Sequence, residues 1–430
     1  MRSAVAASLA AACLLVAACG TSATDGGGSG SGSQGGGSGT GTIDMWARDA
    51  DSTFVNQMVD GFNQSQKDVQ VKVTIIPAAN FVQKFGAAAA TGSAPDVAAI
   101  DLVYLPYFSS KNTLEDLTAR SKELNYMDKL SPAHLKLATY QDKLYALPFS
   151  AEASVLYYNK DLFKKAGLDP NKPPKTYAEV KAAAQKIRAL GPDYYGYYFS
   201  GASGGGYAFT CLPYIWAAGG DLLESEGTNE KAIIDSSAGV KDGLSFFKDL
   251  WDSGVVPASA KTDTGANALV AFQSGKVGMF GSGAFAVSNL SKLNFGVTPL
   301  PGKTAGQSSS FAGGDEIAIP SGSKNKDAAW KFLKYVTDVE AQTALGKLGP
   351  VPVRTDVATG AYAKQSPYNP VLGQQMGAGK TPYTTHYNDL INSNNGPLVT
   401  MFQQAVFAGD VDGALSKGQQ QFTEILSKKQ

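Results

Sequence analysis

The sequence predicts an α/β protein in which helices cover a parallel β-sheet. The first observation is that strand and helix patterns alternate between residues 43 and 101. The second is that further strands and helices follow across residues 145–336, whereas the last hundred residues look mostly helical and looped. Such alternation is typical of parallel strands joined by crossover helices that lie on both faces of the sheet. We find no internal repeat.

The amino-terminal elements follow from hydrophobic periodicity. Phe54, Met58 and Phe62 recur at helical spacing, and Pro77 closes an alternating apolar run that is typical of a strand. The predicted order is strand 43–47, a helix around 54–62, strand 69–76, helix 80–90 and a buried strand at 96–101.

The later elements are predicted in the same way. Thr176 and Glu179 have the spacing of a capping box at a helix start. The predicted order is an extended segment 145–159, helix 177–190, helix 237–254, strand 276–280, strand 295–299, strand 316–320 and helix 327–336.

Ligands of parallel α/β sheets bind outside the carboxyl ends of the strands. Trp46 and Asp49 stand at the end of the first predicted strand, and Asp101 ends the third. All three are therefore candidate binding residues, with an ordinary structural role as the alternative for each.

Composition excludes several classes of function. The chain has 37 basic and 37 acidic residues in 430, so its formal charge gives no electrostatic case for nucleic-acid binding. The two histidines, His134 and His386, are far apart, which argues against a histidine-rich metal site or a nucleophilic triad. We expect no metal and no cofactor, and no GxxxxGK[ST] loop for ATP is present.

The first residues resemble a bacterial lipoprotein signal. Arg2 precedes an uncharged apolar stretch, 3–16, that is too short for a comfortable membrane span. Small residues then lead to Cys19, as in a lipobox, where the cysteine receives fatty acyl chains such as palmitate. We expect 1–18 to be a cleaved signal peptide. An uncleaved anchor or an ordinary signal peptide is the alternative.

Residues 19–42 are expected to form a lipidated cysteine followed by a flexible tether. From Thr21 to Thr42 the chain is rich in glycine and serine and has no large apolar side chain, so it cannot offset the entropy of ordering. Cys211 would be the only thiol in the remaining body, and we interpret it as a small buried hydrophobe.

Several runs, in order, resemble the family-1 extracellular solute-binding lipoproteins, the carbohydrate group of ABC importers that includes the maltodextrin-binding protein. Taken with the lipobox, they cover nearly all of the mature chain. The runs are 147–180, which includes Glu-Ala-x-x-Leu-x-Tyr-Asn, then 214–223, 271–290, 312–338 with its Gly-Gly-Asp, and 349–354, GPVPVR.

The resemblance implies a periplasmic-binding-protein-like type II fold, in which two α/β lobes joined by a hinge close on a ligand in the cleft between them. Crossings between the lobes are expected near Phe149, Gly313 and Leu345. The implied division assigns 43–149 plus 313–344 to lobe one and 150–312 plus 345–430 to lobe two.

The resemblance also points to ligand-binding residues. Glu152 matches a ligand-contacting glutamate of the family, and Gly314 and Asp315 lie at a second crossing. Sugar sites combine such polar groups with flat aromatic faces. A structural role is the alternative for every candidate. The further candidates are Tyr207, Phe209, Trp216, Arg354, the cluster 392–395, and Phe285, which stands where many relatives carry a stacking tryptophan.

Three functions are compatible with these features of the sequence. The first is a monomeric, membrane-anchored lipoprotein that captures a sugar and delivers it to ABC permease subunits on the outer side of the membrane. The second keeps the fold and the transport role for another solute: a polyamine, an amino-acid derivative, a polyol or a sugar phosphate. The third is an enzyme such as a two-carboxylate glycosidase, which the resemblance to a non-catalytic family disfavours.

Overall fold

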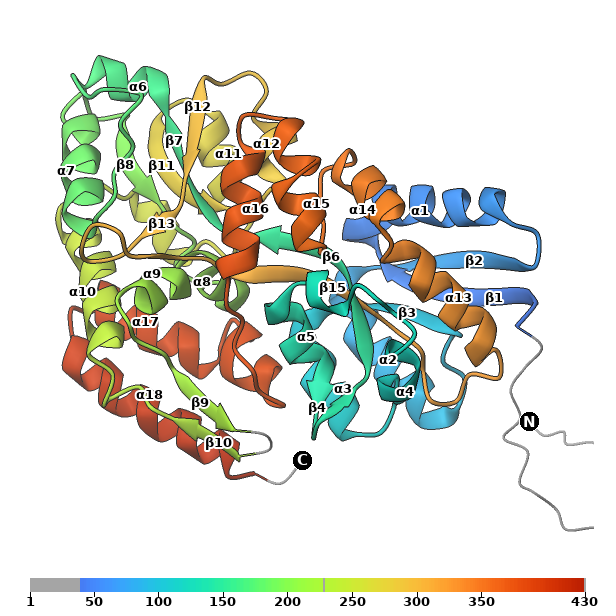
Figure 1. Ribbon diagram of the computed structural model, residues 1–430. Coiled ribbons are helices and arrows are strands. Elements are labelled where there is room, and N and C mark those ends of the chain that lie inside the picture. Colours follow the sequence, from blue (N-terminus) through green and yellow to red (C-terminus); the bar gives the residue numbers. More distant parts are fainter. Residues whose placement is uncertain (1–38, 227–228, 429–430) are drawn as a thin grey trace, which may run out of the picture. The chain divides into compact units, whose positions relative to one another are not determined.

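The computed structural model describes residues 39–226 and 229–428. The expected signal peptide, Cys19 and the tether up to residue 38 lie outside the described residues. Within them the chain forms two α/β lobes, each built on its own β-sheet (Figure 1).

The first lobe contains a five-stranded sheet in which the three amino-terminal strands are parallel, as predicted. Its elements are β1 (Gly41–Arg48), α1 (Ser52–Ser65), β2 (Val69–Ile76), α2 (Ala78–Thr91), β3 (Val97–Asp101), α3 (Leu105–Ser110), α4 (Thr118–Ser121), α5 (Pro132–Ala138), β4 (Thr139–Tyr140), β5 (Lys143–Leu144), β6 (Ala146–Ala153), β15 (Ala312–Ala318), α13 (Lys326–Val336) and α14 (Val339–Gly346). The strand order is β2-β1-β3-β15-β6, with β1 parallel to β2 and β3. The strand β15 runs antiparallel to both of its neighbours.

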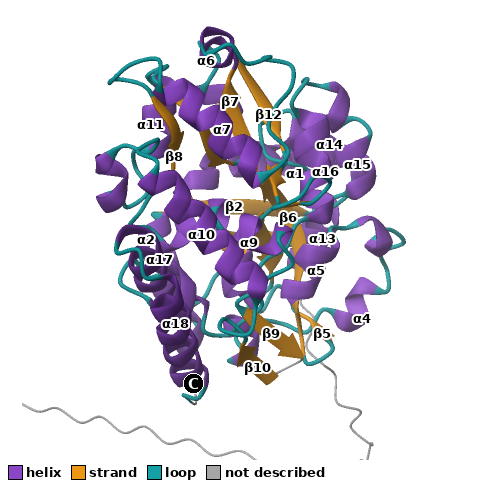
Figure 2. Ribbon diagram, turned by 90° about the vertical axis from the view of Figure 1, so that its left-hand side faces the viewer, coloured by secondary structure: helices purple, strands orange, loops and turns teal. Residues whose placement is uncertain are grey.

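The second lobe contains a four-stranded sheet. The last two helices of the chain, α17 and α18, pack against each other in this lobe (Figure 2). Its elements are β7 (Val155–Asn159), α6 (Lys160–Lys165), α7 (Tyr177–Arg188), β8 (Tyr195–Tyr198), α8 (Gly204–Thr210), α9 (Leu212–Ala217), β9 (Leu223–Glu226), β10 (Asn229–Ala232), α10 (Ala238–Asp252), α11 (Ala268–Gln273), β11 (Val277–Ser282), α12 (Ala286–Asn289), β12 (Phe295–Thr298), β13 (Leu300–Pro301), β14 (Ser308–Ser309), α17 (Pro397–Phe407) and α18 (Val411–Leu426). The strand order is β12-β7-β11-β8.

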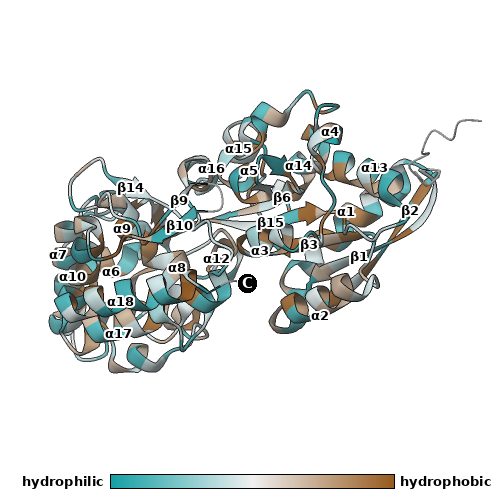
Figure 3. Ribbon diagram, turned by 90° about the horizontal axis from the view of Figure 1, so that it is seen from below, coloured by the Kyte–Doolittle hydropathy of each residue, from teal (hydrophilic) through white to brown (hydrophobic). Residues whose placement is uncertain are grey.

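Two paired segments connect the sheets. The strands β6 and β7 are separated only by Ser154, and the chain returns into β15 through Ser310 and Phe311. The Ser154 hydroxyl accepts a hydrogen bond from the Phe311 amide at 2.8 Å, and the Ser310 hydroxyl donates to the Ser154 carbonyl at 2.9 Å. Figure 3 shows β6 and β15 running between the two halves. The helices α15 (Thr355–Thr359) and α16 (Asn369–Ala378) pack beside this connection.

Most element boundaries agree with the sequence prediction, and the exceptions have physical causes. The strand β1 begins at Gly41 rather than residue 43, because Gly41 and Thr42 pair with Val69 and Gln70. The strand β15 begins at Ala312 rather than 316, although glycine is poor in strands, because its first residues pair with β6. Pairing with a neighbouring strand overrides local propensity at both places.

The helix start at Thr176 is confirmed, with one difference. The Thr176 hydroxyl accepts a hydrogen bond from the Glu179 amide at 3.2 Å. The Glu179 carboxylate accepts from the amide of Lys175 at 2.6 Å, one residue earlier than in a standard capping box. Cys211 is buried and free, as expected. No helix in the described part of the chain is long and apolar enough to cross a membrane.

Candidate functional site

A cavity of about 370 Å³ lies between the lobes, and both lobes contribute side chains to it. Six of the residues singled out from the sequence line this cleft: Asp101, Glu152, Phe209, Phe285, Gly314 and Asn392. Arg48, Asp51, Tyr104, Phe311 and Tyr387 line the cleft as well.

Arg48 organises the polar side of the cleft. It is the last residue of β1, and its guanidinium lies 3.0 Å from an oxygen of Asp101 and 3.2 Å from one of Asp51. A third contact, at 2.6 Å, joins it to Asp315 in β15. Burial lowers the pKa of Arg48, but the three carboxylates outweigh that effect and raise it. Arg48 therefore remains charged and ties the ends of β1, β3 and β15 together.

Asp315 lies beneath the cleft floor and has no exposed surface. Burial raises its pKa well above the ordinary range, against the opposing charge of Arg48. Burial also raises the pKa of Asp101, although Arg48 is its direct partner. Asp101 keeps part of its carboxylate at the cleft surface, so the structure places Asp101 where a ligand can reach it and Asp315 where it supports Arg48.

Glu152 points from β6 toward the second lobe. Its carboxylate accepts a hydrogen bond from the amide of Ala284 at 2.8 Å, just before Phe285. Burial raises the pKa of Glu152 to about 8, although backbone amides of Ala284 and Phe285 oppose the shift. Glu152 is therefore mostly protonated at neutral pH, so it can donate a hydrogen bond to a ligand hydroxyl as well as accept one.

Gly314 allows β15 to approach β6 closely. Its φ is +123°, and a Cβ there would lie 2.0 Å from the carbonyl oxygen of Ser150. Only glycine adopts this backbone conformation without strain. The close approach places Glu152 opposite Gly313 and leaves the cleft floor without side chains at these glycines.

Aromatic rings form the facing wall of the cleft. Phe209 lies between Phe285 and Phe311, with ring centroids 6.3 Å and 5.5 Å away. Phe285 is 49% exposed, which is unusual for a large apolar side chain. These three rings give this wall of the cleft an aromatic lining against which the apolar face of a ligand can pack.

Three of the sequence candidates lie elsewhere. The ring of Trp46 is covered by the ammonium of Lys84 at 4.8 Å. The carboxylate of Asp49 accepts from the amides of Ala50 and Ala78, both at 2.9 Å, and so joins the end of β1 to the start of α2. Tyr207 is fully buried, and its hydroxyl donates to the carbonyl of Gly201 at 2.7 Å. None of the three lines the cleft.

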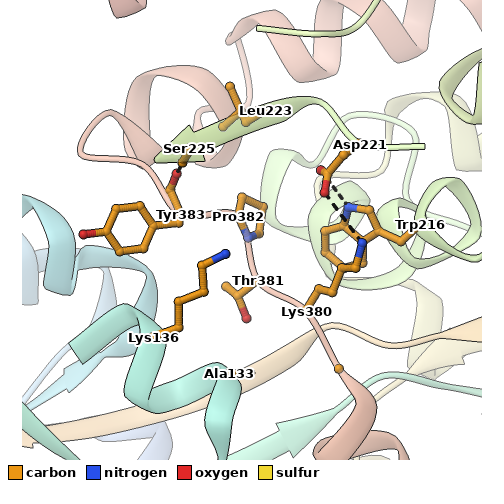
Figure 4. Close-up of a pocket in the computed structure, with 11 residues that line it drawn as sticks. Ala133, Lys136, Trp216, Asp221, Leu223, Ser225, Lys380, Thr381, Pro382 and Tyr383 are labelled. Atoms are coloured by element: carbon orange, nitrogen blue, oxygen red, sulfur yellow. Dashed lines mark hydrogen bonds and ion pairs between the residues drawn. The ribbon is translucent and has the colours of Figure 1, made fainter. Parts of the chain in front are cut away.

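Trp216 and Arg354 also lie outside the cleft. Trp216 lines a second cavity of about 210 Å³, where its indole donates to Asp221 at 3.1 Å (Figure 4). Arg354 forms two hydrogen bonds to the carboxylate of Asp356, at 3.1 Å and 2.8 Å. This is the structural ion pair that the sequence left open as its alternative role.

Three important residues of the cleft, Arg48, Tyr104 and Tyr387, were not among the candidates. Arg48 stands at the end of a parallel strand, so the rule that selected Asp49 could have selected it one residue earlier. Tyr104 follows β3 in the same way. Asn392 belonged to the polar cluster expected to enter the cleft, and it does line it. Tyr387 carries no sequence signal that separates it from other buried tyrosines.

The cleft can therefore bind a polar, largely uncharged molecule. Arg48 offsets part of the carboxylate charge, Glu152 is mostly neutral at pH 7, and the opposite wall is aromatic. Within the described residues no group of three or more His, Cys, Asp or Glu side chains could hold a metal ion.

Comparison with known proteins places the chain in a family. The family model described as bacterial extracellular solute-binding protein matches residues 46–343. The maltotriose-binding protein of Pyrococcus abyssi is 28% identical over 304 residues, which are 66% of this chain and 60% of that protein.

Solved structures share the fold. The cyclic alpha-maltosyl-1,6-maltose binding protein of Arthrobacter globiformis is 28% identical with a TM-score of 0.78, over 90% of this chain and 99% of that one. The sugar-binding protein MalE of Xanthomonas citri has a TM-score of 0.80 over 90% of this chain and 98% of that one. At 24% identity, it is similar in fold alone.

Proposed function

Because this chain belongs to the bacterial extracellular solute-binding protein family, we propose that it captures a sugar or oligosaccharide for an ABC importer. The observation that supports this most strongly is the composition of the cleft. Asp101, Arg48 and Glu152 offer hydrogen-bonding groups from one side, and Phe285 and Phe209 offer ring faces from the other. Sugars need both kinds of surface.

The charges of the cleft support a neutral ligand. Asp101 is paired with Arg48 at 3.0 Å, and the raised pKa of Glu152, about 8, keeps that group mostly protonated at neutral pH. Buried polar groups of this kind reject ligands that leave them unpaired, so they also give specificity. Two of the similar proteins are named for the ligands maltotriose and cyclic alpha-maltosyl-1,6-maltose.

A second candidate function keeps the fold and the transport role but takes a cationic solute such as a polyamine or an amino-acid derivative. The specific observation in its favour is that Asp51, Asp101 and Asp315 surround a single arginine. A cationic ligand could pair with these carboxylates. Its only favourable contact with the exposed ring of Phe285 would be a cation–π interaction.

In the proposed mechanism, the ligand binds one lobe and the second lobe closes over it. The free energy of closure comes from contacts made only in the closed form. We place the moving lobes at 43–149 with 313–344 and at 150–312 with 345–430. The closed form then delivers the ligand to permease subunits. No chemical conversion of the ligand is proposed, in keeping with a family of solute-binding proteins.

We further propose that the protein is a monomer held by lipid at the outer side of the cell membrane. The support is the sequence that ends in Cys19, with the glycine- and serine-rich segment after it. Two acyl chains give stable attachment where one does not. Metabolic labelling with a fatty-acid analogue should mark the wild-type protein and leave Cys19→Ser unmarked and released from membranes. Labelling of the variant would contradict the anchor.

A ligand screen tests the binding role. The protein without residues 1–19 is heated with mono-, di- and oligosaccharides, and with polyamines, amino acids and sugar phosphates for comparison. A ligand at 100 times its dissociation constant adds about 2.7 kcal/mol to the free energy of unfolding. Glu152→Ala should abolish the shift, whereas Glu424→Ala, on the exposed face of α18, should retain it. A shift only with amines would favour the second candidate.

A further inference from the structure

The second cavity, of about 210 Å³ and lined by Trp216, is distinct from the cleft (Figure 4). Its walls come from both lobes: Lys136 stands in α5, Trp216 in α9, and the segment 379–383 follows α16. None of the residues that line this cavity also lines the cleft. Trp216 is therefore a candidate binding residue without a role in the cleft, and its own cavity offers one.

The connection between the two sheets separates this cavity from the cleft. The backbone of Lys380 is paired with that connection, because its carbonyl accepts from the amide of Ala312 and its amide donates to the carbonyl of Ser310, both at 2.9 Å. The ring of Trp216 stacks on the ring of Phe311, with centroids 6.1 Å apart and an interplanar angle of 26°. Phe311 lines the cleft, so the two spaces meet only through this pair of stacked rings.

Lys136 brings to the second cavity a positive charge that has no partner. Figure 4 shows its ammonium pointing into the cavity, and no acceptor among the described residues contacts it. Lys380, by contrast, lies 3.8 Å from the carboxylate of Asp221, which also accepts a hydrogen bond from the indole of Trp216. Two ammonium groups and one carboxylate line the cavity, and this excess of positive charge complements a singly charged anion.

The rest of the lining is largely apolar and held in place. Trp216 and Pro382 are buried, and they offer a flat surface for an apolar ligand. The hydroxyl of Tyr383 donates to the carbonyl of Thr139 at 2.9 Å, while its own carbonyl accepts from the hydroxyl of Ser225 at 2.8 Å. These bonds fix the wall before a ligand arrives, which lowers the entropic cost of binding. The volume is below the roughly 300 Å³ of sites for drug-sized ligands, so it suits a single ring.

We propose that the second cavity is a binding site for a small aromatic carboxylate. The carboxylate pairs with Lys136, whose ammonium suits a single anionic group, and the ring packs against Trp216 and Pro382. Because α5 belongs to the first lobe and α9 to the second, the occupant contacts both lobes and stabilises the described arrangement. Any coupling between the carboxylate and a ligand of the cleft is reciprocal, since each changes the affinity of the other by the same factor.

Fluorine NMR of protein labelled with 5-fluorotryptophan gives a readout at the site. The chain has four tryptophans, and the resonance that is absent from Trp216→Phe is assigned to Trp216. Titration of the protein without residues 1–19 with benzoate should move this resonance and leave the other three in place. Benzamide, which has the same shape but no charge, should bind more weakly by about tenfold, because it cannot form a charge-assisted hydrogen bond with Lys136.

Three variants locate the site. Lys136→Met removes the unpaired ammonium and should weaken benzoate binding by about tenfold, with an unchanged unfolding midpoint because Lys136 is exposed. Lys122→Met is the matched control, since Lys122 is an exposed lysine of the same lobe that does not line the cavity. Phe285→Ala changes the cleft and should also leave the benzoate titration unaltered.

Every outcome supports or overturns the site. Movement of the Trp216 resonance that depends on Lys136 and on the charge of the ligand supports it. Equal affinities for benzoate and benzamide, or unchanged binding by Lys136→Met, would identify an adventitious ion only. Loss of the shift in Phe285→Ala would place the benzoate in the cleft, and a Trp216 resonance that does not move at millimolar benzoate would show that the cavity binds no such ligand. No arm uses a sugar, so the result does not depend on the proposed function.

Discussion

The guanidinium of Arg48 and the carboxylate of Asp315 are 2.6 Å apart, although 267 residues separate them in the chain. Arg48 ends the first strand of the sheet, and Asp315 lies fully buried in the strand that returns from the second lobe. Their contact therefore joins the floor of the cleft to the strand that returns from the second lobe.

Removing the cation should destabilise the protein strongly. Arg48→Met leaves Asp315 buried without its partner, and the loss of one partner from a buried pair lowers the free energy of unfolding by about 3 kcal/mol. Urea denaturation measures the change. The control is Lys129→Met, whose ion pair with Asp128 lies on the surface, and its unfolding midpoint should not move. Equal effects in the two variants would show that the buried pair has no special role.

The pH dependence of ligand binding should report on Glu152. Its pKa of about 8 means that the protonated form prevails at pH 7, and ligand closure removes the remaining water from it. Because an ionised carboxyl would then be buried, affinity should fall as the pH rises from 7 to 9.5. Glu152→Gln, which mimics the protonated form, should bind at pH 7 and show little dependence on pH. Rising affinity of the wild type at high pH would contradict this.

Glu316 should contribute less to the free energy of unfolding at neutral pH than at acid pH. It is fully buried, and neither carboxylate oxygen has a hydrogen-bond partner among the described residues. Burial raises its pKa well above the ordinary value, and the charge of Asp315 adds to the shift. The folded protein therefore keeps a proton that the unfolded chain releases near pH 4.3.

The stability that the retained proton of Glu316 contributes is complete at pH values below the pKa of this group in the unfolded chain. It is lost as the pH rises toward the higher pKa of Glu316 in the folded protein. Glu316→Met, of similar length, removes the unpaired polar group and should stabilise the protein at pH 7.5 by about 1 to 3 kcal/mol. The gain should be smaller at pH 4.5. Urea denaturation at both pH values measures it, with Glu424→Met on exposed α18 as the variant that should change nothing.

Gly314→Ala should damage both stability and binding. The added Cβ would lie 2.0 Å from the carbonyl oxygen of Ser150, so β6 and β15 would have to separate. We expect a loss of about 3 kcal/mol or more in unfolding free energy, since a backbone conformation reserved for glycine and a steric clash act together. Thermal unfolding measures the loss.

The matched variant is Gly92→Ala. Its φ is also positive, +70°, but nothing lies within 4 Å of the added Cβ. Only the backbone strain remains, about 1 to 2 kcal/mol. If both variants lost the same free energy of unfolding, the close packing of β6 and β15 would not be the reason that position 314 requires glycine.

Local elements were predictable because their causes are local. The stripe of Phe54, Met58 and Phe62 indicates α1, and all three side chains are buried in that helix. The Thr176 hydroxyl caps α7 by accepting a hydrogen bond from the amide of Glu179, three positions later in the chain. Both patterns depend on residues a few positions apart, so a helix can be recognised before its packing partners are known.

Candidate site residues were harder to place, because a residue type does not tell which way its side chain faces. Phe285 and Tyr207 were both aromatic candidates in similar surroundings, yet one is 49% exposed in the cleft and the other has no exposed surface. Arg354 and Arg48 are both arginines next to acidic residues, yet only Arg48 lines the cleft.

The sequence by itself determined the alternation of strands and helices over residues 43–101, the main helices of the second half, the family resemblance, and the positions of Glu152 and Gly314 on strands between the two sheets. These follow from patterns within short windows of the chain. Only the tertiary structure decided that Arg48 pairs with Asp315, that Asn392 bonds to Tyr104, and that β15 begins at Ala312. Those contacts join residues far apart in sequence, and their geometry is set by how whole sheets pack rather than by any local preference.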